Sequence, residues 1–106
     1  MDEKVAMRVI YEGLAGEDCI PIKLRQGQGL DKEQLQAVKD AINFLAQEWK
    51  SRDMVPKRLA AAFVDIQSAM DWGRDRYSEA EQDEIEDAAI ELVDLAYDLF
   101  EDSPHR

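Results

Sequence analysis

Residues 78–102 read SEAEQDEIEDAAIELVDLAYDLFED, and this stretch decides the fold that we expect for the chain. Ser78 followed by Glu81 is the pattern of a capping box, in which a hydroxyl and a glutamate satisfy backbone N–H groups at the start of a helix. Apolar residues then recur at intervals of three and four, at Ile85, Ala88, Leu92, Leu95 and Leu99. This spacing predicts a helix over residues 79–102 with one apolar face, which is widened by Ala89, Val93, Ala96 and Phe100.

The same stretch carries eleven acidic residues and no lysine, arginine or histidine. Residues 1–76 hold 13 acids and 12 bases, so nearly all of the net charge of −11 belongs to the last helix. Acids four residues apart repel by roughly 0.2–0.5 kcal/mol per pair, and acids in the last turn meet the negative end of the helix dipole. Because this pattern works against the helix, it indicates either a surface for a partner or a helix whose charge serves solubility. For a partner surface, the residues that we expect to bind are Asp87, Glu91, Asp94 and Asp98, with Tyr97 and Trp72 as aromatic anchors.

Two further helices are predicted from the same kind of spacing. Over residues 31–50, Asp31 is a helix cap and the apolar positions are Leu35, Val38, Ile42, Leu45 and Trp49. Over residues 56–72, Pro56 suits a first turn and the apolar positions are Leu59, Phe63, Ile66 and Met70. Residues 1–13 fit a weak helical stripe and equally the alternation of a strand, and we favour the helix.

Residues 14–30 predict a loop with an extended segment. Ile20, Ile22 and Leu24 alternate with polar or proline positions, which is the pattern of extended chain. Because Pro21 cannot donate to a ladder, this segment is either a short edge strand or a cover that lays apolar side chains over the open end of a bundle. The sequence GQG at 27–29 indicates a turn.

These elements predict an all-α fold: a single helical domain over residues 1–106, built as a small antiparallel three- or four-helix bundle with an extended segment between helices 1 and 2. One cysteine leaves no internal disulfide, and the N-terminus lacks the pattern of a signal peptide, so we expect a cytoplasmic protein. No apolar run is long enough to span a membrane. The acidic balance argues against nucleic acid and anionic lipid as ligands and favours a basic protein partner.

Patterns for catalysis or metal binding are weak. His105 is the only histidine, so Cys19 and the serines have no base partner of that kind. The pattern Asp83-Glu84-x-x-Asp87 followed by Glu91-x-x-Asp94 resembles part of the magnesium site of the MazG-type all-α nucleotide pyrophosphohydrolases. In that family the two halves lie on different helices, whereas here they lie four residues apart on one helix and cannot face each other. We expect neither an enzyme nor a bound cofactor or metal.

Three hypotheses for function follow. The first is a non-enzymatic acidic protein-binding module, in its most concrete form an inhibitor or immunity-type protein that blocks a nuclease-like toxin or another cation-rich cleft. The alternative is a structural homodimer or larger homo-oligomeric bundle in which the acidity only serves solubility. The third is a metal-dependent nucleotide phosphohydrolase.

Overall fold

A computed structural model describes residues 1–71 and 74–101 of the chain, and all regular structure in these residues is helical. The elements, in order, are α1 (Glu3–Ala15), α2 (Ile20–Arg25), α3 (Lys32–Glu48), α4 (Lys57–Val64), α5 (Ile66–Asp71), the 3-10 turn η1 (Arg74–Arg76) and α6 (Glu79–Phe100). The predicted all-α fold is therefore confirmed, and the ambiguous N-terminal segment is a helix.

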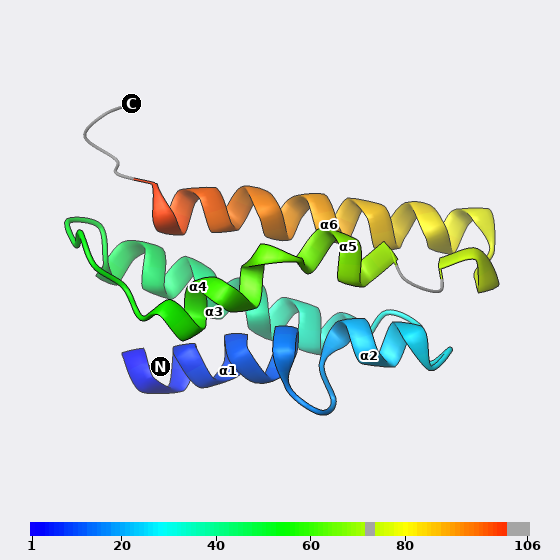
Figure 1. Cartoon of the computed structure of the whole chain (residues 1–106), viewed down its shortest axis with the longest axis horizontal. Helices are drawn as coiled ribbons and strands as arrows, with labels where there is room; N and C mark the ends of the chain where they lie inside the picture. The colour runs from blue at the N-terminus through cyan, green and yellow to red at the C-terminus, as the bar shows by residue number, and fades with distance from the viewer. Residues whose placement is uncertain (72–73, 102–106) are drawn as a thin grey trace.

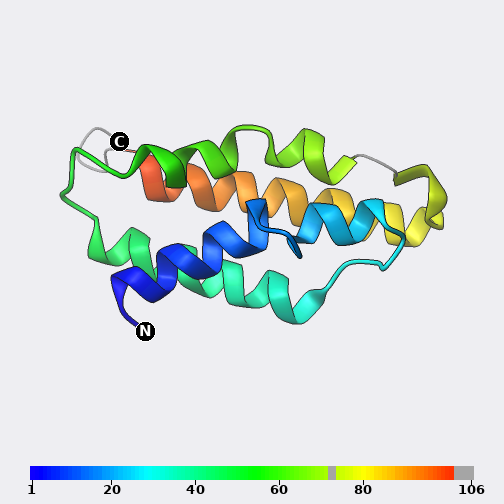
Figure 2. The same cartoon turned by 60° about the horizontal axis from the view of Figure 1, so that its bottom comes forward.

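Within residues 1–71 and 74–101, the helices form an up-and-down bundle of four rods, arranged as in Figure 1. The first rod consists of α1 followed by α2, the second is α3, the third consists of α4 followed by α5, and the fourth is α6 (Figure 2). α3 packs against α1 and α6, whereas α4 packs against α1, and α5 packs against α2 and α6. Among the described residues, α6 thus packs mainly between α3 and α5, and exposed residues such as Asp87 and Asp94 lie on the rest of its surface.

The expected extended segment between the first two helices is wrong, because residues 20–25 form the short helix α2. Pro21 lies in its first turn, where the missing N–H of proline costs nothing. Ile20 and Leu24 lie one helical turn apart and are both buried in the core, which replaces the strand-like alternation. The turn that follows uses Gly27 and Gly29 in the left-handed region, with φ values of 80° and 85°, which favour glycine.

The single helix predicted over 56–72 is interrupted at Asp65, which separates α4 from α5 and has φ −110° and ψ 18°. Aspartate is a poor residue for the interior of a helix, because its side chain competes for nearby backbone groups. The interruption lets α4 follow α1 while α5 turns to pack on α2 and α6. One consequence is that Val64, at the end of α4, has a side chain that is 77% exposed.

The core lies between the four rods and receives side chains from each of them. The largest fully buried residues are Ile10, Ile20, Val38, Ile42, Leu45, Met70, Leu24 and Leu92. The predicted stripe of α3 is buried throughout, and that of α6 is buried except at Leu95, which is half-buried. α1 and α3 approach closely at Gly13, where an added Cβ would clash with a methyl group of Val38.

Two polar contacts tie α2 and the start of α3 to the rest of the bundle. The Tyr77 hydroxyl donates to the Leu24 carbonyl at 2.6 Å and accepts from the Gly29 N–H at 3.1 Å, which anchors the chain just before α6. At the start of α3, the Asp31 carboxylate caps the helix and accepts from the Lys23 ammonium at 2.8 Å. The hydrogen bond from Lys23, followed by the capping bond, lowers the pKa of Asp31 below its ordinary value.

Candidate functional site

Helix α6 begins as predicted, with a complete capping box. The Glu81 N–H donates to the Ser78 hydroxyl oxygen at 3.2 Å, and the Ser78 N–H donates to the Glu81 carboxylate at 3.2 Å. The helix then continues for 22 residues, which corresponds to a rod about 33 Å long at 1.5 Å per residue. Because its core stripe is buried against the other rods, the charged residues are left on the sides and on the outward surface.

The structure separates the four predicted acids of α6 into two pairs. Glu91 and Asp98 lie toward α3: Glu91 accepts from the Lys39 ammonium at 2.9 Å, and Asp98 lines a hollow beside the end of α3. Asp87 and Asp94 are exposed, and neither forms an ion pair with any residue that the structure describes. Only part of the acidic helix is therefore neutralised from within the described chain.

Of the two predicted aromatic anchors, Tyr97 lies within the described residues and Trp72 does not. The Tyr97 side chain is 66% exposed and lies on the side of α6 that faces α4 and α5. Trp72 lies outside the described residues. Tyr97 is thus the one predicted anchor that can be placed, and it lies beside the acidic ridge formed by Asp87 and Asp94.

A second apolar stripe runs along α6 and was missed in the sequence analysis. It consists of Ile90, Val93, Tyr97 and Phe100, spaced by three and four residues. Ile90 is 43% exposed and Phe100 is 36% exposed, so this stripe is displaced from the core. The signal was present as a second set of helical spacings, but Val93 and Phe100 were assigned to the edge of the core stripe.

The second stripe forms one wall of an open groove between α6 and the α4–α5 rod, which we call the α5–α6 groove. Its larger hollow, of about 830 Å³, is lined mainly by Phe63, Val64, Ile66, Val93, Tyr97 and Phe100. The rings of Phe63 and Phe100 meet edge to face, with centroids 5.4 Å apart. A smaller hollow of about 370 Å³ shares Gln67 with the larger one. It is lined by residues of both helices, among them Asp71 of α5 and Glu86 of α6. The described residues that line the two hollows include acids but no lysine or arginine.

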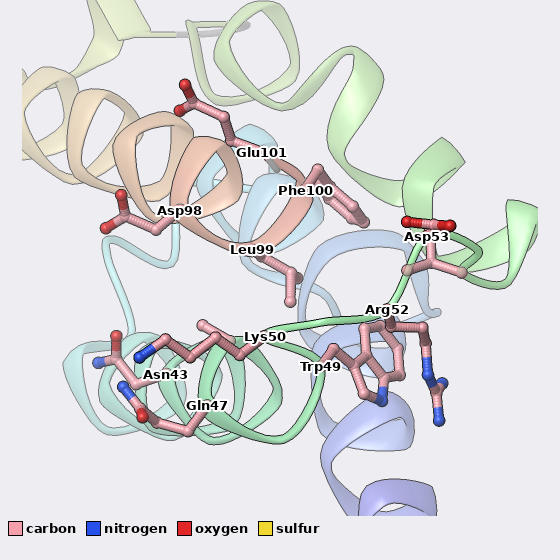
Figure 3. Close-up of a pocket in the computed structure, with 12 residues that line it drawn as sticks. Asn43, Gln47, Trp49, Lys50, Arg52, Asp53, Asp98, Leu99, Phe100 and Glu101 are labelled. Atoms are coloured by element: carbon pink, nitrogen blue, oxygen red, sulfur yellow. The ribbon is translucent and has the colours of Figure 1, made fainter. Parts of the chain in front are cut away.

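A different hollow lies between the C-terminal ends of α3 and α6 (Figure 3). It has a volume of about 420 Å³ and a mixed lining that includes Lys50, Arg52 and Asp98. The Arg52 guanidinium lies over the Trp49 ring, 4.8 Å from its centroid, and donates to the Glu3 carboxylate of α1 at 3.0 Å. Figure 3 shows Arg52 directed away from α6, so this arginine of the α3–α4 turn contacts α1 and does not neutralise the last helix.

The carboxylates of the phosphohydrolase-like pattern do not converge. Glu84 forms an ion pair with Lys32 at 3.1 Å, and Glu91 forms one with Lys39. Among residues 1–71 and 74–101, no group of three or more histidine, cysteine, aspartate or glutamate side chains is gathered so that it could hold a metal ion. Cys19 is buried with a free thiol at the start of α2. None of the helices in the described ranges has both the length and the apolar character to cross a bilayer.

No family model matches the chain, and comparisons with curated proteins and with solved structures give no match. The class of protein is therefore defined by the fold and the surface alone. It is a small all-α bundle whose last helix combines an acidic ridge with an open apolar groove.

Proposed function

We propose that this chain is a non-enzymatic acidic binding protein that presents the outward surface of α6 to a basic protein partner. The observation that carries the proposal is the pair Asp87 and Asp94, which are exposed and without an ion pair among the described residues, next to the exposed Tyr97. Charge beside an exposed aromatic ring supplies both steering and an anchor for a partner.

The concrete form that we propose is an inhibitor or immunity-type protein that covers a cation-rich cleft, such as that of a nuclease-like toxin. Carboxylates spaced along a rod can occupy the positions that phosphates take in such a cleft. The net charge of −11 would speed the encounter with a basic partner. We also propose a cytoplasmic location, since a single cysteine allows no internal disulfide.

The test uses a lysine-rich unstructured peptide as a defined basic probe and isothermal titration calorimetry as the assay. We expect the double variant Asp87→Asn/Asp94→Asn to bind the probe about 2- to 30-fold more weakly, because each exposed ion pair contributes roughly 0.2–1 kcal/mol. The matched control is Glu12→Gln/Glu17→Gln, which removes the same charge from exposed positions at α1 and the turn after it.

The salt dependence adds a second criterion. Binding of the unmodified protein should weaken strongly between low and high salt, because the Debye length falls from about 30 Å at 0.01 M to about 3 Å at 1 M. Equal weakening in the test and control variants would show an effect of net charge alone and would contradict the assignment to α6. Absence of binding at low salt would also contradict it.

A further inference from the structure

We infer that the α5–α6 groove binds a cationic amphipathic helix of the partner, with the apolar face of that helix seated on the second stripe of α6. This inference rests on the proposed function, and it specifies the partner's structure and the site that receives it. Three features of the described residues support it: the exposure of the apolar lining, the sign of the charges around it, and the shape given by two neighbouring helices.

Several exposed apolar residues of the described chain meet at the groove, whereas Met1 and Met54 lie away from it. Val64 is 77% exposed, Tyr97 is 66% exposed and Phe100 is 36% exposed, and all three line the same groove. Single exposed apolar residues are ordinary on protein surfaces, but a contiguous set in a groove marks an interaction site. Ile90 extends the stripe by one helical turn toward the start of α6.

Among the described residues, the charged side chains that line the groove are all acidic. Asp71 and Glu86 line its smaller hollow, and Glu101 lines the far end of the larger one. Asp94 lies three residues before Tyr97 on the exposed surface of α6, so it borders the apolar stripe on its outer side. Because no lysine or arginine lines either hollow among the described residues, the groove favours an apolar surface that is flanked by cations.

The walls of the groove are helices that lie side by side, α5 with the end of α4 on one side and α6 on the other (Figure 1). A third helix fits such a groove by placing its own ridges, spaced by three and four residues, between theirs. A partner helix of about 18 residues would be about 27 Å long, which is shorter than α6. Lysines beside its apolar face would then meet Asp94, which borders the stripe on its outer side.

A second copy of this chain is disfavoured as the occupant by the same charges. A symmetric dimer brings the same surface of each copy together, so Asp94 of one copy would approach the acidic surface of the other. Like charges facing each other across an interface oppose association, and each chain carries −11. The complementary occupant is therefore a cationic helix.

The experiment compares two labelled synthetic peptides that contain the same leucines and lysines. One peptide has leucine at helical spacing, and the other is shuffled so that it has no apolar face. In fluorescence anisotropy titrations, we expect this protein to bind the amphipathic peptide at least about 10-fold more tightly than the shuffled one. Circular dichroism should show that the amphipathic peptide is helical in the complex.

The variant that tests the groove is Val64→Ser/Tyr97→Ser, chosen because both side chains are mostly exposed and the core should be unaffected. It should lose the 10-fold preference for the amphipathic peptide. The matched control is Met54→Ser, which changes a residue that is 79% exposed in the α3–α4 turn and does not line the groove. The control should keep the preference, and thermal melting of each variant should confirm the fold.

The outcomes separate this inference from the proposed function. Equal binding of both peptides, or a preference retained in Val64→Ser/Tyr97→Ser, would overturn the groove while leaving the acidic surface supported if Asp87→Asn/Asp94→Asn weakens both peptides. If neither peptide bound at low salt, both proposals would be overturned. A salt-insensitive dimer that dissociates in the groove variant would identify a second copy as the occupant and overturn the inference.

Discussion

Replacing Asp87 and Asp94 with asparagine should leave the fold intact and raise its stability, even though it weakens binding. Each aspartate lies three or four residues from other acids of the same helix, and these neighbours are Asp83, Glu84, Glu91 and Asp98. At roughly 0.2–0.5 kcal/mol per like-charge pair, the repulsion removed is about 1–2.5 kcal/mol before screening. Asparagine and aspartate have similar helix propensities, so no large opposing term enters.

Because both side chains are exposed, solvent screening reduces this gain, and we expect about 1 kcal/mol at low salt. In a chain of 106 residues such a gain corresponds to a rise in melting temperature of about 4–8 °C. Urea titrations at about 0.01 M and about 1 M salt would measure it, and the gain should nearly vanish at high salt, where the Debye length is about 3 Å. An increase in stability combined with weaker binding is the signature of charges that are kept for function.

Glu91→Gln is the matched control for this prediction. It removes one acid from the same helix but also removes the ion pair with Lys39, whose side chain is only 18% exposed. We expect no gain, since the relief of repulsion is offset by the loss of the partner of a half-buried ammonium. If Asp87→Asn/Asp94→Asn instead lost about 1 kcal/mol or failed to fold, these carboxylates would stabilise the bundle, and their assignment to a partner surface would be wrong.

Three further predictions concern the bundle itself. Gly13→Ala should lower the free energy of unfolding by about 1 kcal/mol, because overpacking against Val38 outweighs the better helix propensity of alanine. In chemical denaturation, the double variant Gly13→Ala/Val38→Ala should lose less stability than the sum of the losses in the two single variants. Ser78→Ala should cost about 1 kcal/mol in the same assay, since it removes the hydroxyl of the capping box of α6. Asp31→Asn keeps a helix cap but loses the charge pair with Lys23. Because the pKa of Asp31 is lowered in the folded protein, its carboxylate stabilises the fold above the ordinary value of 3.8, and this stability is lost as the pH falls below that value. The melting temperatures of the variant and the unmodified protein should therefore converge at lower pH.

Features that depend on residues within one turn or two were predictable from the sequence. The capping box at Ser78, the apolar stripes of α3 and α6 and the concentration of acids on the last helix need only local spacing, because a helix brings residues three and four apart onto one side. The all-α class follows from the same patterns.

Local patterns did not predict the conformation of the short elements correctly. A helix of six residues is marginal in water, so α2 depends on Ile20 and Leu24 being buried against the other rods. The extended segment that the sequence predicted contains the same apolar residues as α2, so only their contacts with the other rods distinguish the two conformations. The division of the third rod at Asp65 likewise serves the packing of α4 on α1 and of α5 on α6.

The sequence by itself determined that this protein is helical and that its negative charge lies on one C-terminal helix, since period and charge are properties of neighbouring residues. Tertiary structure decided which of those acids are neutralised, because the ion pair of Lys39 with Glu91 joins residues 52 positions apart. It also decided that Val64 and Tyr97 line one groove. Both depend on how whole rods pack beside each other, and packing is set by the fit of many side chains at once rather than by any single stretch.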